Sequence, residues 1–238
     1  VYSYPKYLDG EKGIITGTKI INRFKIVINA AMQSIKNFDF FKILTNLFLY
    51  TGYNKSVKDY IQPILKYMAI GMPFLAYMDN EKKTAIIIGV AYFIIYFLTA
   101  LASRLSGRFI TLFQQLEKPM NLTLIIGFIF GIISGLGVII GIYIIPVLGF
   151  LIIIIIENLR KPIGIGIVAD LSNNSSMATT LSITSQAKSF FAAILAPIIG
   201  YLADLYNPGV ALLTISTLLL LLLPIYWLRN NSKKIIIN

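Results

Sequence analysis

Long apolar segments separated by short polar turns run from Ile86 to the region of Trp227. An α-helix needs about 20 mostly apolar residues to cross about 30 Å of hydrocarbon. Residues 209–227 meet this length without a charged side chain. Together with a more polar segment before Ile86, the pattern predicts six helical spans, at residues 38–66, 83–103, 121–138, 141–169, 177–204 and 208–228.

The apolar stretch from Leu122 to Ile156 is too long for a single span. It contains Gly137 and Gly141, and glycine is typical of tight turns. We therefore expect a hairpin near these glycines, with the third and fourth spans as antiparallel neighbours.

Residues 1–37 lack this apolar density and begin with an irregular segment. From Lys19 to Lys36, apolar residues recur at helical spacing against Asn, Arg and Lys. This pattern predicts a basic amphipathic helix on an anionic membrane surface. The alternative is a soluble helix packed on the protein's own loops. Residues 229–238 are expected to form a cytoplasmic tail.

The composition excludes an ordinary soluble globular domain, because 57% of the 238 residues are hydrophobic, only 13% are charged and the mean hydropathy is +0.78. The chain contains no Cys and no His, which removes disulfides, thiolate chemistry and the usual zinc ligands. Without these residues or a dense acidic cluster, an enzyme is a poor fit. We expect no catalytic residue, no cofactor, no metal and no nucleic-acid partner.

Lysine and arginine are distributed unequally among the expected connections. One side of the membrane would hold Lys19, Arg23, Lys25, Lys36, Lys42, Arg104, Arg108, Lys118, Arg229, Lys233 and Lys234. The other side would hold only Lys66, Lys82 and Lys83. The positive-inside rule then predicts a multi-pass cell-membrane protein with both ends of this segment in the cytoplasm.

Two spans, the first and the fourth, carry charged and polar side chains. Charges at membrane depth cost roughly 2.5 to 3.5 kcal/mol each, so they usually face a bundle interior or a water-filled path. Lys55 and Asp59 can pair on one helical face, and Glu157 can pair with Arg160 or Lys161. The candidates for the substrate path or its energy coupling are Asn54, Lys55, Asp59 and Gln62 in the first span and Glu157, Asn158, Arg160 and Lys161 in the fourth.

Either polar helix could instead be shorter. The first could leave the membrane near Tyr53, so that residues 55–62 form an outer loop. The fourth could end near Asn158, with the following cations as interfacial anchors, although the apolar residues 163–168 then need a place to be buried.

The fifth span carries Gln186 and Lys188 in its polar first half. Serine and threonine often bond back to their own helix, but Gln and Lys in a span need other partners. We expect these two residues to form a third wall of the same polar passage.

Other patterns concern packing and the nature of a solute. Small residues at every fourth position indicate close helix approach, at Gly127, Gly131 and Gly135 in the third span and at Ala192, Ala196 and Gly200 in the fifth. The aromatic side chains of Tyr50, Tyr53 and Tyr60 would suit an amphipathic or hydrophobic solute, or serve as interfacial anchors. The acceptor pattern at Asn121 falls on the predicted cytoplasmic side, so no glycan is expected there.

Three short stretches carry a family resemblance. Residues 103–108 read Ser-Arg-Leu-Ser-Gly-Arg, residues 178–182 read Ala-Thr-Thr-Leu-Ser, and residues 197–204 read Pro-Ile-Ile-Gly-Tyr-Leu-Ala-Asp. In this order they resemble the D-R-x-G-R loop, the R-A-T-x-L-S helix start and the P-x-x-G-x-L-A-D helix end of the C-terminal half of major facilitator superfamily (MFS) transporters. Ser103 replaces the acid of the first motif and Met177 the arginine of the second.

The resemblance covers essentially the whole chain and implies an all-α polytopic bundle of six transmembrane helices, numbers seven to twelve, built as two inverted three-helix repeats. Residues 1–37 would be the cytoplasmic loop between the two halves of the transporter, and residues 38–228 the bundle. The N-terminal six-helix half would be the missing partner. Arg104, Gly107 and Arg108 would belong to a cytoplasmic gating loop.

The function that follows is secondary active transport of a small molecule by alternating access, with proton-coupled efflux as one form. With no His, Asp59 and Glu157 are the only acids at a suitable depth for proton coupling, and Glu157 is favoured because its span continues past it. The alternative is a structural or sensor membrane protein that uses a half-transporter fold without transport.

Overall fold

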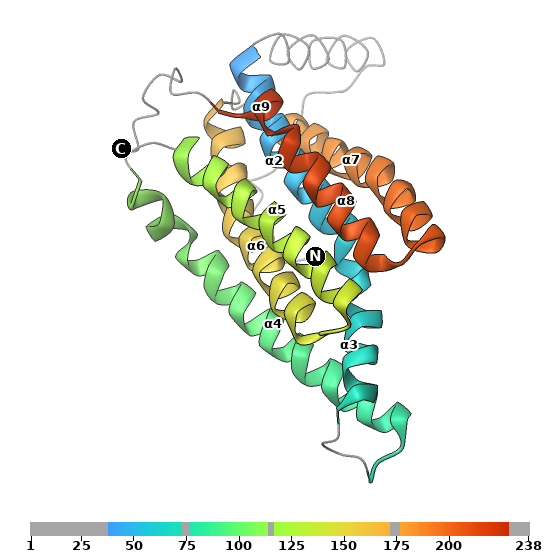
Figure 1. Cartoon of the computed structure of the whole chain (residues 1–238). Helices are drawn as coiled ribbons and strands as arrows, with labels where there is room; N and C mark the ends of the chain where they lie inside the picture. The colour runs from blue at the N-terminus through green and yellow to red at the C-terminus, as the bar shows by residue number, and fades with distance from the viewer. Residues whose placement is uncertain (1–37, 73–76, 114–116, 172–176, 229–238) are drawn as a thin grey trace, which may run out of the picture.

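The structure is a computed structural model that describes residues 38–72, 77–113, 117–171 and 177–228 (Figure 1). All regular structure in these ranges is helical, so the described part of the chain is all-α. The predicted amphipathic helix from Lys19 to Lys36 and the predicted tail lie outside the described residues. The elements are α2 (Phe38–Val57), η2 (Lys58–Tyr60), α3 (Ile61–Gly71), α4 (Asn80–Thr111), α5 (Glu117–Ile140), α6 (Ile144–Leu171), α7 (Met177–Leu205), α8 (Pro208–Leu221) and α9 (Leu223–Tyr226).

The helical segments coincide with the six predicted ones, with differences mainly at their ends. Three helices are long and apolar enough to cross a membrane: α4, α5 and the part of α7 from Thr184 to Leu205. They indicate a multi-pass membrane protein. Helix α8 is apolar but shorter, and α6 has the length of a span but carries three charged residues near its middle, Glu157, Arg160 and Lys161.

The first segment is a broken helix rather than a helix followed by a loop. Helix α2 passes through the 3₁₀ turn η2 directly into α3. Pro63 lies in the first turn of α3 and has no N–H to donate to the carbonyl of Asp59, which favours the tighter turn at this point. Residues 55–62 are therefore helical. Helix α6 likewise continues past Asn158 to Leu171.

The predicted hairpin between α5 and α6 is present. Gly141 has a φ of +82°, and its N–H donates to Val138 O while the N–H of Ile142 donates to Gly137 O. This pair of bonds is a Schellman motif, in which a left-handed glycine ends the helix. Gly137 itself lies within α5, so the turn is made by the second of the two predicted glycines.

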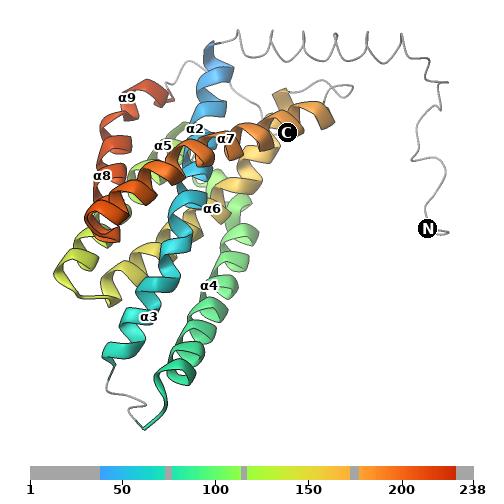
Figure 2. The ribbon, with the colours of Figure 1, turned by 90° about the vertical axis from the view of Figure 1, so that its right-hand side faces the viewer.

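Helices α5, α6 and α8 form one packed group, with α5 against both of the others (Figure 1). Helix α2 packs on α7, and α4 packs on α6. Figure 2 shows α3 beside the first half of α4, which agrees with the contacts between them. Helices α4 and α7 therefore lie on the outside of the described bundle.

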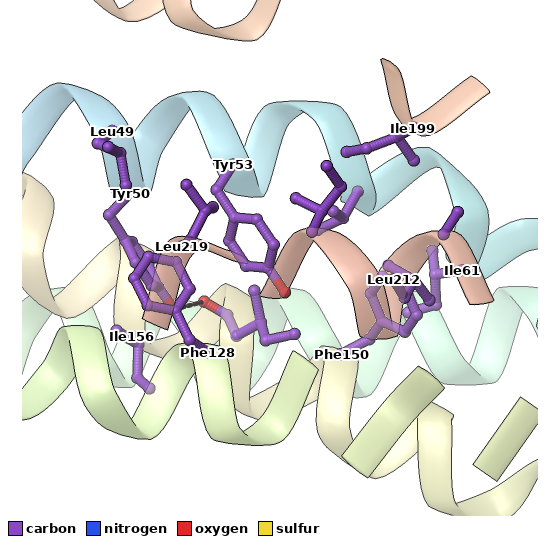
Figure 3. Packing of buried hydrophobic residues seen from close by; sticks show 14 of the residues in the cluster. Leu49, Tyr50, Tyr53, Ile61, Phe128, Phe150, Ile156, Ile199, Leu212 and Leu219 are labelled. Carbon is purple, nitrogen blue, oxygen red and sulfur yellow. Dashed lines mark hydrogen bonds between the residues drawn. The ribbon is translucent and has the colours of Figure 1, made fainter. Parts of the chain in front are cut away.

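The core lies where α2, α5, α6 and α8 meet, as Figure 3 shows. Tyr50, Tyr53 and Phe128 are fully buried there and pack ring against ring. The Tyr50 hydroxyl donates to Ile153 O at 3.1 Å, and the Tyr53 hydroxyl shares a 2.8 Å hydrogen bond with Ser216 Oγ. Each buried phenol thus has the partner that burial requires.

The glycine stripe of α5 makes this packing possible. A Cβ at Gly127 would stand 2.4 Å from the Tyr50 hydroxyl, and one at Gly135 would stand 2.6 Å from Gly209 O. These distances are far below van der Waals contact, so the stripe must consist of glycine for α2 and α8 to approach this closely. In contrast, a Cβ at Gly200 in the predicted stripe of α7 meets no atom within 4 Å.

The last segment begins and ends with recognisable local signals. Asn207 caps α8 by accepting from the Val210 N–H at 2.9 Å, and Pro208 occupies the start of the helix. Pro224 lies at the start of α9, where it cannot donate to a preceding carbonyl. The apolar run therefore divides into α8 and the short α9.

Large apolar side chains are exposed along α4 and α7. Phe93 and Phe97 on α4 and Phe190 and Ile198 on α7 are all exposed. In water such contiguous surface would be a liability, whereas lipid or a partner helix covers it at no cost.

Candidate functional site

Arg160 is the most deeply buried charged group among the described residues, with only 2% of its surface exposed. Its guanidinium donates to Asn46 Oδ1 at 2.7 Å, to Asn46 O at 3.1 Å, and to Met120 O and Thr123 Oγ1. It also lies over the Tyr50 ring, 5.0 Å from the centroid. Arg160 therefore joins α2, α5 and α6 through neutral acceptors.

The same network continues to the end of the last helix. Asn46 Nδ2 donates to Tyr226 O at 3.2 Å and approaches Asn121 Oδ1 at 3.4 Å. Asn121 in turn donates to Leu228 O at 2.9 Å and accepts from Leu228 N at 3.1 Å. These two amides satisfy backbone groups that the end of α9 leaves without helical partners.

Glu157 lies one turn before Arg160 on α6 and is 7% exposed. Thr51 of α2 lies beside its carboxylate, which is attracted by Arg160, Lys188 and Lys161, while the Thr51 hydroxyl donates to Leu47 O at 3.1 Å. In the described residues the hydrogen bonds of Arg160 go to the partners above rather than to Glu157. The predicted direct pair is thus an attraction at longer range.

Two lysines, Lys161 and Lys188, lie near this carboxylate, and a third, Lys55, lies beside Lys188. Lys188 of α7 is partly buried and interacts electrostatically with Glu157, with Lys161 of α6 and with Lys55 of α2. The Lys55 ammonium donates to Ser189 Oγ of α7 at 3.2 Å. Lys55 and Lys161 are exposed. The structure therefore brings together some of the predicted polar residues of the first, fourth and fifth segments, namely Lys55, Glu157, Arg160, Lys161 and Lys188.

Asn54 is buried on α2, and its Oδ1 has no hydrogen-bond partner. It follows Thr51 by three residues, which places both on one face of the helix. The neighbouring Ser56 bonds to Gly52 O at 2.9 Å and to Ala192 O at 3.2 Å, so it belongs to the contact with α7. An unsatisfied buried amide oxygen is uncommon in folded proteins and marks a place where a donor would be stabilised.

Asp59 and Gln62 lie away from this cluster. Both are exposed, in η2 and α3. Gln62 interacts with the side chain of Tyr92 on α4, and Asp59 acts electrostatically on the same tyrosine. Lys55 bonds to Ser189 and not to Asp59, so the predicted pair on one helical face does not form.

The remaining candidates occupy helix surfaces. Asn158 is partly buried and donates to Ile154 O on its own helix at 2.9 Å, while Gln186 is exposed on α7. Arg104, Gly107 and Arg108 are exposed in the last turns of α4. The motif expected to be a cytoplasmic loop is therefore helical.

Tyr50 and Tyr53, which the sequence offered as contacts for a hydrophobic solute, are fully buried in the core, with their hydroxyls bonded inside the bundle. They cannot line an open path in this conformation. Only Tyr60 of that set is partly exposed.

Several residues of the site were not singled out from the sequence. Thr51 and Ser189 are too ordinary in a helix to attract notice. Asn121 and Thr123 form an Asn-x-Thr pattern, which drew attention only to glycosylation. Asn121 is the first residue of the predicted third span, where a polar residue is ordinary, so no sequence signal marked it as buried.

The arrangement can hold and exchange charge but offers little for covalent chemistry. Among the described residues, no group of three or more acidic side chains gathers that could hold a metal ion. Comparison with models of protein families, with curated proteins and with solved structures finds no match to this chain.

Proposed function

We propose that this chain is the C-terminal half of a secondary transporter of the MFS type, which crosses the cell membrane six times and moves a small molecule by alternating access. The described helical segments would be transmembrane helices seven to twelve. An N-terminal six-helix half would complete the solute path. The exposed apolar faces of α4 and α7 are available for lipid and for that partner.

The packing of the helices supports an inverted repeat. Exchanging the two halves of the described bundle replaces α2–α3 by α6, α4 by α7 and α5 by α8–α9. Under this exchange the α2–α7 pair becomes the α6–α4 pair, and both pairs are in contact. The α5–α8 pair becomes itself and is also in contact. These pairs agree with the pseudo-twofold relation that is typical of transporters with inverted repeats. The extensive α5–α6 contact, in contrast, has only a small counterpart, between α2 and α9.

The observation that carries the proposal is the charged cluster around Glu157, near the middle of the 28-residue helix α6. Charged side chains at that depth are expensive, and a scaffold gains nothing from their cost. Three helices contribute them, and the inverted-repeat arrangement puts the inner ends of such helices around one site. A carrier uses charges in this position to bind a solute or a coupling ion.

The decisive experiment is transport by the full-length protein in proteoliposomes, comparing Glu157→Gln with the unchanged protein. We expect counterflow exchange to persist in the variant while uphill accumulation driven by a pH gradient is lost, because the amide cannot release and bind a proton. Glu81→Gln, at the exposed start of α4, is the matched control and should accumulate solute normally.

Normal gradient-driven accumulation by Glu157→Gln would remove Glu157 as the coupling group. Absence of any exchange by the unchanged protein, across a broad set of solutes, would favour the structural or sensor alternative.

The six-span arrangement has its own test, for which the lack of cysteine is convenient. Single cysteines at Asn80 and Asn207 should react with an impermeant maleimide from outside intact cells. A cysteine at Gly107, where an added Cβ meets no atom within 4 Å, should react only after the membrane is opened. Labelling of Gly107→Cys in intact cells would contradict six spans with both ends in the cytoplasm.

A further inference from the structure

The charges around Glu157 do not balance. This single carboxylate faces three cations, Arg160, Lys161 and Lys188, and a fourth, Lys55, lies beside Lys188 and bonds to Ser189. Among the residues that the structure describes, the other acids whose influence is seen on this side of the bundle, Asp59 and Asp204, act on tyrosines rather than on the lysines. The described groups of the site therefore carry an excess of positive charge.

The four cations are not equivalent. Arg160 is buried and surrounded by oxygen acceptors from Asn46, Met120 and Thr123, so its charge is already solvated by the protein. The lysines have no comparable set of acceptors. Lys55 has one serine hydroxyl, and Lys161 is exposed. The lysines are thus the groups whose charge can interact with a bound solute.

We propose that the solute is a small anion that carries a carboxylate or phosphate group and binds between Lys55, Lys161 and Lys188. This inference rests on the proposed transport function and names the class of substrate. An anion would offset the cost of holding three ammonium groups at membrane depth. Glu157 would compete with it electrostatically, so that protonation of Glu157 favours anion binding.

The uncharged groups of the site agree with this assignment. Thr51 and Ser189 supply hydroxyls beside Glu157 and Lys55, and the unsatisfied Asn54 Oδ1 can accept from a protonated oxygen of the solute. A hydrophobic solute fits poorly, because Tyr50 and Tyr53 are fully buried.

The test measures the electrostatic potential at the site and does not depend on transport. Ser185→Cys places one thiol on an exposed position of α7, one helical turn before Ser189. The reaction rates of this thiol with an anionic and a cationic methanethiosulfonate reagent are measured in the purified full-length protein. We expect the anionic reagent to be favoured, and the ratio of the two rates to fall about fivefold in Lys188→Met, as expected from attraction between unit charges over a short distance.

Lys161→Met is the second variant, because its exposed side chain can be replaced without disturbing the fold, and it should lower the ratio in the same direction. Lys66→Met, an exposed lysine of α3 away from the cluster, should leave it unchanged. A ratio that does not respond to either cluster lysine overturns the proposal.

Occupancy is tested in the same reaction. Inorganic phosphate or succinate at millimolar concentration should slow modification of Ser185→Cys, and the more protective of the two identifies the anionic group. Tetraphenylphosphonium should not protect. Protection by the cation, or by neither anion, overturns the proposal. Anion protection combined with absent counterflow would refute transport and leave the anion site standing.

Discussion

Arg160 and Lys161 are neighbours on α6, carry the same charge and lie in opposite environments. Arg160 is 2% exposed and donates to oxygens from three other residues, whereas Lys161 is exposed. Adjacent residues on a helix point about 100° apart, so one faces the packed core and the other the open side of the bundle. The charge of Arg160 is used in packing the helices together, whereas the charge of Lys161 is accessible to a ligand.

The sequence grouped both cations as candidates for the substrate path. Burial and hydrogen bonding separate them. Arg160 suits its position because a planar guanidinium can bond several acceptors at once, while a lysine ammonium is a point charge on a flexible stem. The two sides of α6 can therefore be tested separately.

The largest effect is expected from replacing Arg160 by Met. The change leaves Asn46 Oδ1 and Thr123 Oγ1 without their donor and should lower the free energy of unfolding by about 3 kcal/mol. Lys161→Met should change it by less than about 0.5 kcal/mol, as is usual for exposed positions. Unfolding by SDS in mixed micelles measures both. Equal losses in the two variants would contradict the comparison.

A second contrast is between the glycine stripe of α5 and the small-residue stripe of α7. A Cβ at Gly131 would stand 2.1 Å from the Tyr53 hydroxyl and 2.3 Å from Ser216 Oγ, so Gly131→Ala should cost about 1 to 3 kcal/mol through overpacking. Gly200→Ala meets open space and should be neutral or stabilising, because alanine is the better helix former. The same unfolding assay applies. A neutral Gly131→Ala would show that α5 and α8 are not as close as described.

Two buried amides provide a smaller contrast. Asn121→Ala removes the bonds to both backbone groups of Leu228 and should cost about 1 to 2 kcal/mol. It should also speed hydrogen exchange at the Leu228 amide. Asn158→Ala loses only a bond to its own helix and should leave that exchange rate unchanged. If the Leu228 amide exchanged at similar rates in both variants, the hydrogen bonds between Asn121 and Leu228 would be contradicted.

The smallest effect concerns the bond between Tyr53 and Ser216. Tyr53→Phe and Ser216→Ala should each cost about 1 kcal/mol, since each leaves the other hydroxyl buried without a partner. The double variant should cost less than the sum of the two, which a double-mutant cycle measures directly. Tyr67→Phe, on an exposed tyrosine, should be neutral. Strict additivity would mean that the bond does not form.

The positions of the helices could be predicted well from the sequence, because they depend on the lengths of the apolar segments and on the turn-forming residues between them. Both are local features of the chain. The hairpin at Gly141 is an example, since a left-handed residue after a helix is nearly always glycine. The two breaks, at η2 and between α8 and α9, were not predicted. Both lie beside a proline, Pro63 and Pro224, within segments whose apolar pattern continues.

For the candidate site, only a set of residues could be predicted from the sequence, namely the polar and charged residues that are costly to place inside a membrane. The sequence singled out Glu157 and Lys188 as groups that need partners, and the structure brings them within electrostatic reach of each other. It could not distinguish Arg160 from Lys161, because this distinction depends on Asn46 and Thr123, which lie far away along the chain. Nor could it exclude Tyr50 from the path, since the aromatic pattern is the same for a core residue.

The order in which the Arg160 network is synthesised has a consequence for how the protein is made. Every hydrogen-bond acceptor of Arg160 precedes it in the chain, at Asn46, Met120 and Thr123. These acceptors have therefore already been synthesised when α6 is made. The partners of Asn46 and Asn121 at residues 226–228 are synthesised after Arg160. Because chains assemble from the N-terminus during synthesis, the docking of α8 and α9 would follow the insertion of α6, and a ribosome stalled before residue 226 would leave these two amides without their backbone partners.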